Sequence, residues 1–451
     1  MAVRTLRAMG LGRYRELLRI PGVPGLLLAA FIARLPYGMF ALSLILLLRA
    51  EGFDYAAIGI VTAASGLAVG LAAPVFGRVI DRVGQTRVLV GTAVFGAVAD
   101  VAVVVAALSG AGTALLAILA LVGGLSVPPV SPSLRTLLPG LVGRDRLDTA
   151  FAFDALQLEG VFILGPLLAV AGGLSVPPVS ASLRTLLPGL VGRERLDTAF
   201  AFDALQLEGV FILGPLLTAG IATAASPQAA VLTVGALQTV GGLAVAASPA
   251  SRAWRPAERE PGTRRAGALS IGGLRTLVAA LAITAVSMGV LEIGIPAFAE
   301  RESSRGDAGW LFALWGVGSL AGGLWYGARQ WRRGAGRRYL FIAAGLTLGL
   351  APLPLAGSLP AFAIVLVVAG LMLAPSTAAC YSLVGELAPE GALTEAYAWQ
   401  IVAYVCGSSV GAWVAGFVVD ELGVAAALAC APAAAGLGLL VAVVGRRSLV
   451  A

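Results

Sequence analysis

The sequence contains no lysine and no histidine, so all 31 of its basic residues are arginines. The missing lysine excludes a phosphate-binding P-loop and a pyridoxal Schiff base, because both need a lysine side chain. The missing histidine leaves carboxylates as the groups that could exchange protons. Cysteine is scarce, and Cys380, Cys406 and Cys430 lie inside apolar segments at spacings that indicate neither a metal site nor a disulfide framework. We therefore expect no cofactor, no metal and no soluble catalytic site.

Charged residues are also scarce, at 12% of the chain, whereas 59% of the residues are hydrophobic. With a mean hydropathy of +0.93, this composition predicts an all-α protein that crosses a membrane many times. The net charge of +7 could suggest nucleic-acid binding, but the arginines lie in short loops between apolar runs, which is a topology signal.

The arginines also predict the orientation of the chain. Only Arg49, Arg301 and Arg305 fall on the predicted outer side and Arg34 is embedded, while the remaining arginines gather in segments of the opposite side. This distribution places both termini in the cytoplasm, in a protein of the cell inner membrane. The apolar segments with the clearest limits are 25–48, 55–76, 88–108, 228–247, 274–298, 308–328 and 424–444, and further segments begin near 113 and 393.

A charged turn, GRVIDRVGQTR, interrupts the apolar runs at residues 77–87. Two glycines permit a tight bend and a close helix approach, the acid can cap a helix start, and the arginines favour the cytoplasmic side. The spacing resembles the signature loop between helices two and three of the major facilitator superfamily, although Gln85 and Thr86 stand where basic residues are common. The matching residues are Gly77, Asp81, Arg82, Gly84 and Arg87. The alternative is an ordinary inside turn.

This resemblance implies two six-helix bundles joined by a cytoplasmic linker. The expected divisions are an N-terminal bundle at 1–247, a basic linker at 248–270 and a C-terminal bundle at 271–451. In the family, the acid of the signature loop is thought to face the inner end of helix eleven, which here is Asp81 against the helix that begins near Leu393.

A long repeat adds to this plan. Residues 123–168 recur at 172–217, shifted by 49, and the two copies differ only at Pro132/Ala181 and Asp145/Glu194. Removing one copy leaves 451 minus 49, or 402 residues. The repeat predicts about two extra segments, a second helix-four end and a second helix five. We expect one copy of helix five to occupy the bundle and the other to lie towards its edge.

Each copy of helix five carries a candidate cavity acid, Glu159 or Glu208. The residues that follow resemble a partial form of the glycine-proline motif found in helix five of superfamily antiporters. The matching pairs are Gly165 with Pro166 and Gly214 with Pro215. Close packing of small residues is the alternative explanation.

Other polar residues lie inside apolar segments and are candidates for proton or substrate contacts. Arg34 either reaches the cytoplasmic surface or faces an anionic group in a cavity. Glu292 is a lone acid, which favours a cavity role over a structural ion pair. The remaining candidates are Asp100 and the group of Trp399, Gln400 and Tyr404, which either line a substrate path or simply pack.

The resemblance implies a secondary active transporter with a small-molecule substrate bound between the halves. Proton-coupled efflux of a drug-like compound or metabolite is the specific prediction, since the chain has few buried acids, a partial antiporter motif and no sugar-type polar density. The alternatives are an uptake permease and a transport-dead protein inactivated by the duplication. Protons and the lipid bilayer are the other expected partners, and the chain is predicted to be a monomer without enzymatic activity.

Overall fold

The computed structural model describes residues 23–64, 67, 85–124, 210, 212–249, 268–328, 334–388 and 393–449. Within these ranges the chain is helical and forms no strand. Seven of the described helices are long and apolar enough to cross a membrane. Helices suit this setting because they satisfy their backbone hydrogen bonds internally, which the interior of a bilayer requires.

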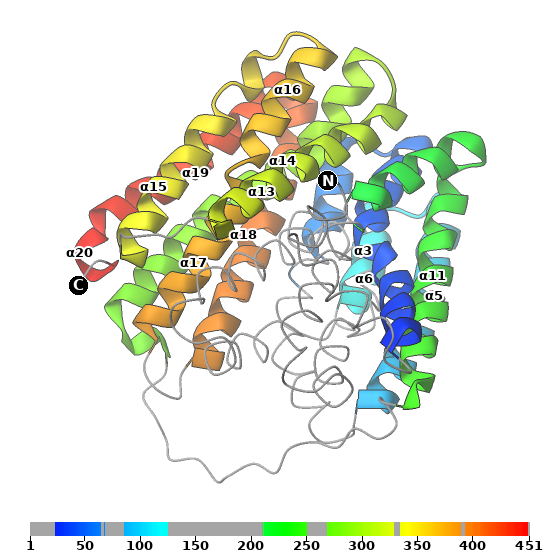
Figure 1. Cartoon of the computed structure of the whole chain (residues 1–451). Coiled ribbons are helices and arrows are strands. Elements are labelled where there is room, and N and C mark those ends of the chain that lie inside the picture. Colours follow the sequence, from blue (N-terminus) through cyan, green and yellow to red (C-terminus); the bar gives the residue numbers. More distant parts are fainter. Residues whose placement is uncertain are drawn as a thin grey trace, which may run out of the picture.

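The helices before residue 250 form the first of two groups, here called the N-terminal helix group (Figure 1). In it, α11 packs along α3 and α5, and α5 also contacts α6. Its members are α3 (Val23–Ala50), α5 (Gln85–Leu108), α6 (Thr113–Gly124), α11 (Pro227–Ala247) and two short apolar helices, Tyr55–Ala64 and Ile212–Ala224.

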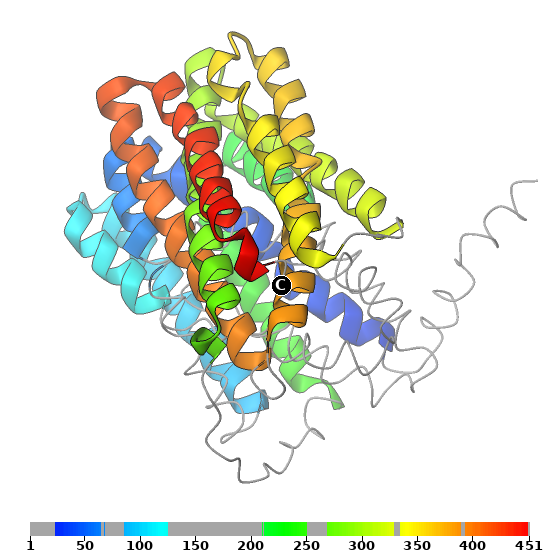
Figure 2. The same ribbon diagram turned by 90° about the vertical axis from the view of Figure 1, so that its left-hand side faces the viewer.

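The helices after residue 267 form the C-terminal helix group, in which α13 packs against both α18 and α19 (Figures 1 and 2). Its helices are α13 (Gly272–Glu302), α14 (Ala308–Ala328), α15 (Ala335–Leu350), α16 (Leu359–Gly370), α17 (Leu373–Leu387), α18 (Leu393–Leu422), α19 (Val424–Val444) and α20 (Arg446–Leu449). Three 3-10 turns, η3 (Ala268–Ser270), η4 (Arg305–Asp307) and η5 (Leu353–Leu355), complete it.

One crossing of the C-terminal group is broken in its middle. Helices α16 and α17 together make an apolar segment of 29 residues, and the chain turns at Leu371 and Met372 between them. Pro375 contributes to the break because it has no amide hydrogen to donate to the carbonyl of Leu371. Broken helices beside a cavity are frequent in secondary transporters.

The observed helices agree closely with the predicted apolar segments. Segments 308–328 and 424–444 have the limits of α14 and α19. Helix α13 is longer than the predicted segment 274–298, since it continues through Glu300 and two further charged residues. Hydropathy marks the apolar part of a helix, whereas the helix itself ends where its hydrogen bonding ends.

Candidate functional site

The two helix groups are joined where α3, α13 and α18 end, a region called the Arg49 end below. Arg49, in the last turn of α3, donates to Glu300 of α13 through Nε to Oε2 at 3.0 Å and through Nη2 to Oε1 at 2.9 Å. This two-pronged pairing is the strongest geometry available to a guanidinium and a carboxylate. It connects residues 251 positions apart in the sequence.

Glu300 has further partners from both sides of this contact. The Tyr55 hydroxyl donates to its Oε2 at 2.7 Å, and Arg305 of η4 donates to its Oε1 at 2.9 Å. The Arg49 guanidinium also lies over the Tyr55 ring, 4.4 Å from its centre. We call Arg49, Tyr55, Glu300 and Arg305 the Glu300 junction. The Glu300 carboxylate lies between the guanidiniums of Arg49 and Arg305. Neutralising Glu300 would therefore leave two positive charges side by side.

A second contact at the same end joins α18 to the helix Tyr55–Ala64. The Asp420 carboxylate accepts hydrogen bonds from the backbone amides of Tyr55 at 3.3 Å and Ala56 at 2.6 Å. These amides belong to the first turn of the helix, where unpaired N–H groups favour an anion. Gly416, one turn before Asp420, permits the approach, because a Cβ atom there would collide with the Tyr55 carbonyl oxygen.

A third contact joins the helix Ile212–Ala224 to α14. A Cβ atom on Gly309 would lie 2.7 Å from the Pro215 carbonyl oxygen and 2.6 Å from the Ala219 Cβ, so the two backbones meet closely. The same helix also contacts α3, where the Thr218 hydroxyl donates to the Met39 carbonyl oxygen at 2.8 Å. The helix that contacts both α3 and α14 therefore begins in the second copy of the duplicated segment and continues past its end at Leu217.

We expect Gly309→Ala to destabilise the protein by about 1–3 kcal/mol, because the added methyl group overpacks this contact. Gly220→Ala is the matched control, since Gly220 lies in the facing helix and has nothing within 4 Å of its Cβ position. Alanine is a better helix former than glycine, so the control should be neutral or stabilising. Thermal unfolding of both purified variants in detergent measures the difference. Equal melting temperatures would show that the contact is loose.

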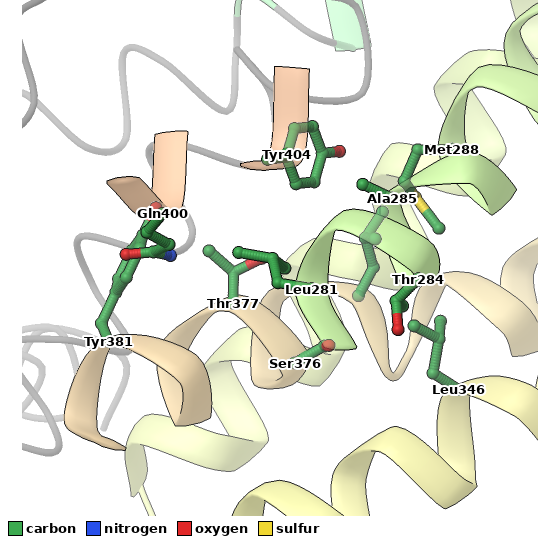
Figure 3. Close-up of a pocket in the computed structure, with 11 residues that line it drawn as sticks. Leu281, Thr284, Ala285, Met288, Leu346, Ser376, Thr377, Tyr381, Gln400 and Tyr404 are labelled. Carbon is green, nitrogen blue, oxygen red and sulfur yellow. The ribbon is translucent and has the colours of Figure 1, made fainter. Parts of the chain in front are cut away.

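A pocket lies inside the C-terminal helix group, between α13, α15, α17 and α18 (Figure 3). Its lining combines apolar side chains with hydroxyl and amide groups, and none of these described residues is charged. The lining residues are Leu281, Thr284, Ala285, Met288, Leu346, Leu373, Ser376, Thr377, Tyr381, Gln400 and Tyr404. In Figure 3, Gln400 and Tyr404 project from α18 towards the side chains of α13 and α17. Two of the predicted α18 residues thus lie at one pocket, next to the broken crossing.

Glu292 lies on the same stripe of α13 as part of this lining. Leu281, Ala285, Met288 and Glu292 follow one another at intervals of four, three and four residues, which places them on one helix face. Glu292 is fully buried, and neither of its carboxyl oxygens has a hydrogen-bond partner in the described part of the chain. A buried carboxyl group without a partner is costly, and in membrane proteins it is a default candidate for function.

The structure places the other predicted residues in different ways. Arg34 is fully buried in α3, whereas Trp399 is 38% exposed and does not line the pocket. Gly214 and Pro215 are both buried in the helix that contacts α14. Asp100 and Arg87 lie in α5. The predicted residues Gly77, Asp81, Arg82, Gly84, Glu159, Gly165, Pro166 and Glu208 lie outside the described residues.

The sequence did not lead us to the Glu300 junction or to the contact of Asp420 with the amides of Tyr55 and Ala56. Arg49 and Arg305 serve there only as orientation signals, and Glu300 and Asp420 are not singled out. A usable signal was available, because arginines are rare on the predicted outer side and acids lie at the ends of helices of that same side. Opposite charges that gather on one side of a bundle predict contacts between its helices.

A family profile and a relative of known sequence both point to one family of transporters. The family profile described as Major Facilitator Superfamily matches residues 26–176 and 276–449. An uncharacterized MFS-type transporter, y4rN, of Sinorhizobium fredii (strain NBRC 101917 / NGR234) is 33% identical over 155 residues, which span 34% of this chain and 38% of that protein.

Two solved structures share the fold at low sequence identity. One is a bacterial homologue of the iron transporter ferroportin in an inward-facing state, with a TM-score of 0.64, 14% identity, and coverage of 94% of this chain and 98% of that one. The other is a mutant of the nucleoside transporter NupG, with a TM-score of 0.58, 13% identity, and coverage of 94% and 99%. Together with the family profile, which matches most of both halves, these findings show that the chain belongs to the Major Facilitator Superfamily.

Proposed function

We propose that this protein is a secondary active transporter that exports a small molecule across the cytoplasmic membrane in exchange for protons. Its family and the transporters that share its fold support transport as the general activity. In this proposal the two helix groups rock against each other, so that a central site opens to one side of the membrane at a time.

The observation that carries the proposal is the set of three contacts between the helix groups at the Arg49 end. They are the Glu300 junction, the hydrogen bonds from the Tyr55 and Ala56 amides to Asp420, and the packing of Gly309 against the helix Ile212–Ala224. They involve different pairs of helices and lie at the same end of the bundle. The arginine distribution supports placing this end on the outer side. The described conformation is then closed to the outside, and transport requires these contacts to break and re-form.

Glu292 is the proposed carrier of the coupling proton. Its carboxyl group is enclosed, has no hydrogen-bond partner in the described ranges, and lies on the helix face that lines the pocket. A charge buried in this way is unfavourable, whereas a neutral carboxylic acid is tolerated. Proton uptake and release by Glu292 would therefore be tied to whether its surroundings are closed or open.

This role predicts that Glu292→Gln abolishes proton coupling without preventing folding, because the amide keeps the shape of the side chain but cannot lose a proton. The measurement uses inverted vesicles with an acidic interior and a pH-sensitive dye, to which cationic and neutral amphiphiles are added. A compound that alkalinises the interior only with the wild-type protein identifies proton-coupled export. Unchanged alkalinisation with Glu292→Gln would remove Glu292 from the mechanism.

The duplication favours a second candidate, a folded membrane protein that no longer transports. An extra copy of a helix at the edge of a bundle could prevent the rocking motion. Shortened variants, argued in the Discussion, separate this possibility from active transport.

A further inference from the structure

We propose that the end of the C-terminal helix group where α13 begins, opposite the Arg49 end, binds the headgroup of an anionic phospholipid. The binding surface is formed by the first turns of α13 and α15 together with α20 (Figures 1 and 2). We call it the α20 arginine surface, and its members are Arg275, Arg337, Arg446 and Arg447. The inference goes beyond the proposed transport, because it assigns a lipid partner to residues that have no part in that mechanism.

Helix α20 is held against the first turns of α13. The Ser448 hydroxyl lies 3.1 Å from the Thr276 hydroxyl, and the Leu449 side chain is buried. A Cβ atom on Gly273 would lie 2.5 Å from the Ser448 carbonyl oxygen, so the two backbones also meet closely. The two arginines of α20 are exposed, but the helix that carries them is fixed by packing.

Arg275 lies at the same contact. Thr276 of α13 packs against Gly445, at the point where α19 ends, and a Cβ atom on Gly445 would collide with it. Arg275 comes directly before Thr276, and Arg446 comes directly after Gly445. Two exposed arginines from different helices therefore flank one helix contact.

Arg337 reaches this level on α15. Helices α15 and α19 run in opposite directions, because the turn after α15 packs against α19 and the helix after α19 packs against α15. A Cβ atom on Gly436 of α19 would lie 3.6 Å from the Thr347 side chain of α15. Arg337 lies ten residues before Thr347 and Arg446 ten residues after Gly436, so both are about 15 Å from this contact on the same side.

The α20 arginine surface has an excess of positive charge. None of its four arginines forms an ion pair within the part of the chain that the structure describes. Glu386 is the acid at this end among the described side chains; it is exposed, and its neighbour Leu387 packs against Gly273. Arginine guanidiniums suit phosphate oxygens, which they bind through paired hydrogen bonds.

The residues just before α20 favour a lipid over a soluble phosphate. Val443 and Val444, in the last turn of α19, are 39% and 77% exposed. Exposed valines followed directly by arginines fit the boundary between acyl chains and headgroups. A phospholipid would cover the valines and pair its phosphate with the arginines, whereas a soluble phosphate would leave the valines uncovered. Basic surfaces at helix ends on the cytoplasmic side attract anionic lipids in this way.

Native mass spectrometry of the purified full-length protein in detergent can compare two lipids. Dioleoyl phosphatidylglycerol and dioleoyl phosphatidylcholine have the same acyl chains and both contain a phosphate group, but only the first carries a net negative charge. We expect phosphatidylglycerol to bind at least about tenfold more tightly. Glycerol phosphate, added at the same concentration, should not displace the bound lipid, because it cannot cover the valines.

Single variants locate the binding surface. Arg275→Gln and Arg446→Gln should each weaken phosphatidylglycerol binding about fivefold, whereas Arg446→Lys should keep most of the affinity. Arg301→Gln is the matched control, since it removes an exposed arginine of the same helix group at the Arg49 end and should bind like the wild type. All four side chains are exposed or partly exposed, so we expect every variant to fold, which melting temperatures without added lipid can check.

Three results would overturn the proposal. They are equal binding of the two lipids, an equal loss of affinity in Arg301→Gln and Arg446→Gln, and displacement of the lipid by glycerol phosphate at the same concentration. The measurement involves no transport, so its failure leaves the proposed function standing, and a failure of transport leaves the lipid surface standing.

Discussion

Glu300→Gln is expected to open the Arg49 end and to raise the labelling rate of a reporter cysteine about tenfold. Glu300 accepts hydrogen bonds from Arg49, Tyr55 and Arg305, so the amide would lose charge-assisted bonds and leave two arginines facing each other. Hydrogen bonds to charged groups are worth about 1.5–3 kcal/mol in general. The Arg49 and Glu300 side chains are each 22% exposed, which argues for the lower limit. A shift of about 1.4 kcal/mol corresponds to a tenfold change in the open population.

Ala412→Cys provides the reporter for this experiment. Ala412 is fully buried in α18, where its carbonyl oxygen would lie 2.7 Å from a Cβ atom on Gly59 of the N-terminal helix group. A maleimide should reach a cysteine there only when the two helix groups separate. The three native cysteines, Cys380, Cys406 and Cys430, are replaced by alanine in this background.

The matched control is Glu302→Gln. Glu302 lies two residues further along α13 and pairs with its neighbour Arg301, so this ion pair does not join the helix groups. The control should leave the labelling rate unchanged, and it removes the same amount of charge from the same helix end. Equal rates for both glutamine variants would show that the Glu300 junction does not hold this end closed. Labelling can be measured on purified protein in detergent, where the result does not depend on orientation.

The sequence predicted the helices well because their signal is local. Segments 308–328 and 424–444 coincide with α14 and α19, since apolar runs of this length have few alternatives to a spanning helix. The junction residues are a different case. Arg49 and Glu300 are 251 residues apart, and no local pattern in either segment indicates that their helices end beside each other.

The candidate site was predictable only in part for the same reason. Glu292 and Gln400 stand out as polar residues inside apolar runs, and the structure places both on faces of the C-terminal helix group that meet at or near the pocket. Thr284 and Thr377 gave no comparable signal, because hydroxyl residues are common in spanning helices, where they can bond to their own backbone. The pocket depends on the packing of four helices, which a single segment cannot specify.

The structure also makes the duplication testable, because the two copies of helix five continue differently. Removing residues 124–172 keeps the second copy, which is followed by Thr218 and Ala219. Removing residues 173–221 instead keeps the first copy, in which Ala169 and Val170 take the places of those two residues. Both variants have 451 minus 49, or 402 residues, and both joints preserve the register of the repeat.

We expect the variant that keeps the second copy to be more stable than the other by about 2 kcal/mol or more. Ala169 cannot replace the buried hydrogen bond from Thr218 to the Met39 carbonyl oxygen, a loss of about 1 kcal/mol. Val170 adds two methyl groups where the Ala219 Cβ lies directly against Gly309, and overpacking of this kind costs about 1–3 kcal/mol. Thermal unfolding in detergent compares the two shortened proteins, and equal or reversed stabilities would show that the helix Ile212–Ala224 has no special place in the bundle.

The same two variants decide between transport and a transport-dead protein. In the vesicle assay, activity in the variant without residues 124–172, combined with inactivity of the full chain, would show that the added segment blocks the rocking motion. Activity in both would show that the added 49 residues are tolerated, as expected if the helix that begins in the second copy already supplies the contacts with α3 and α14. Since Thr218, Pro215 and Gly309 join this helix to α3 and α14, we expect the full chain to transport.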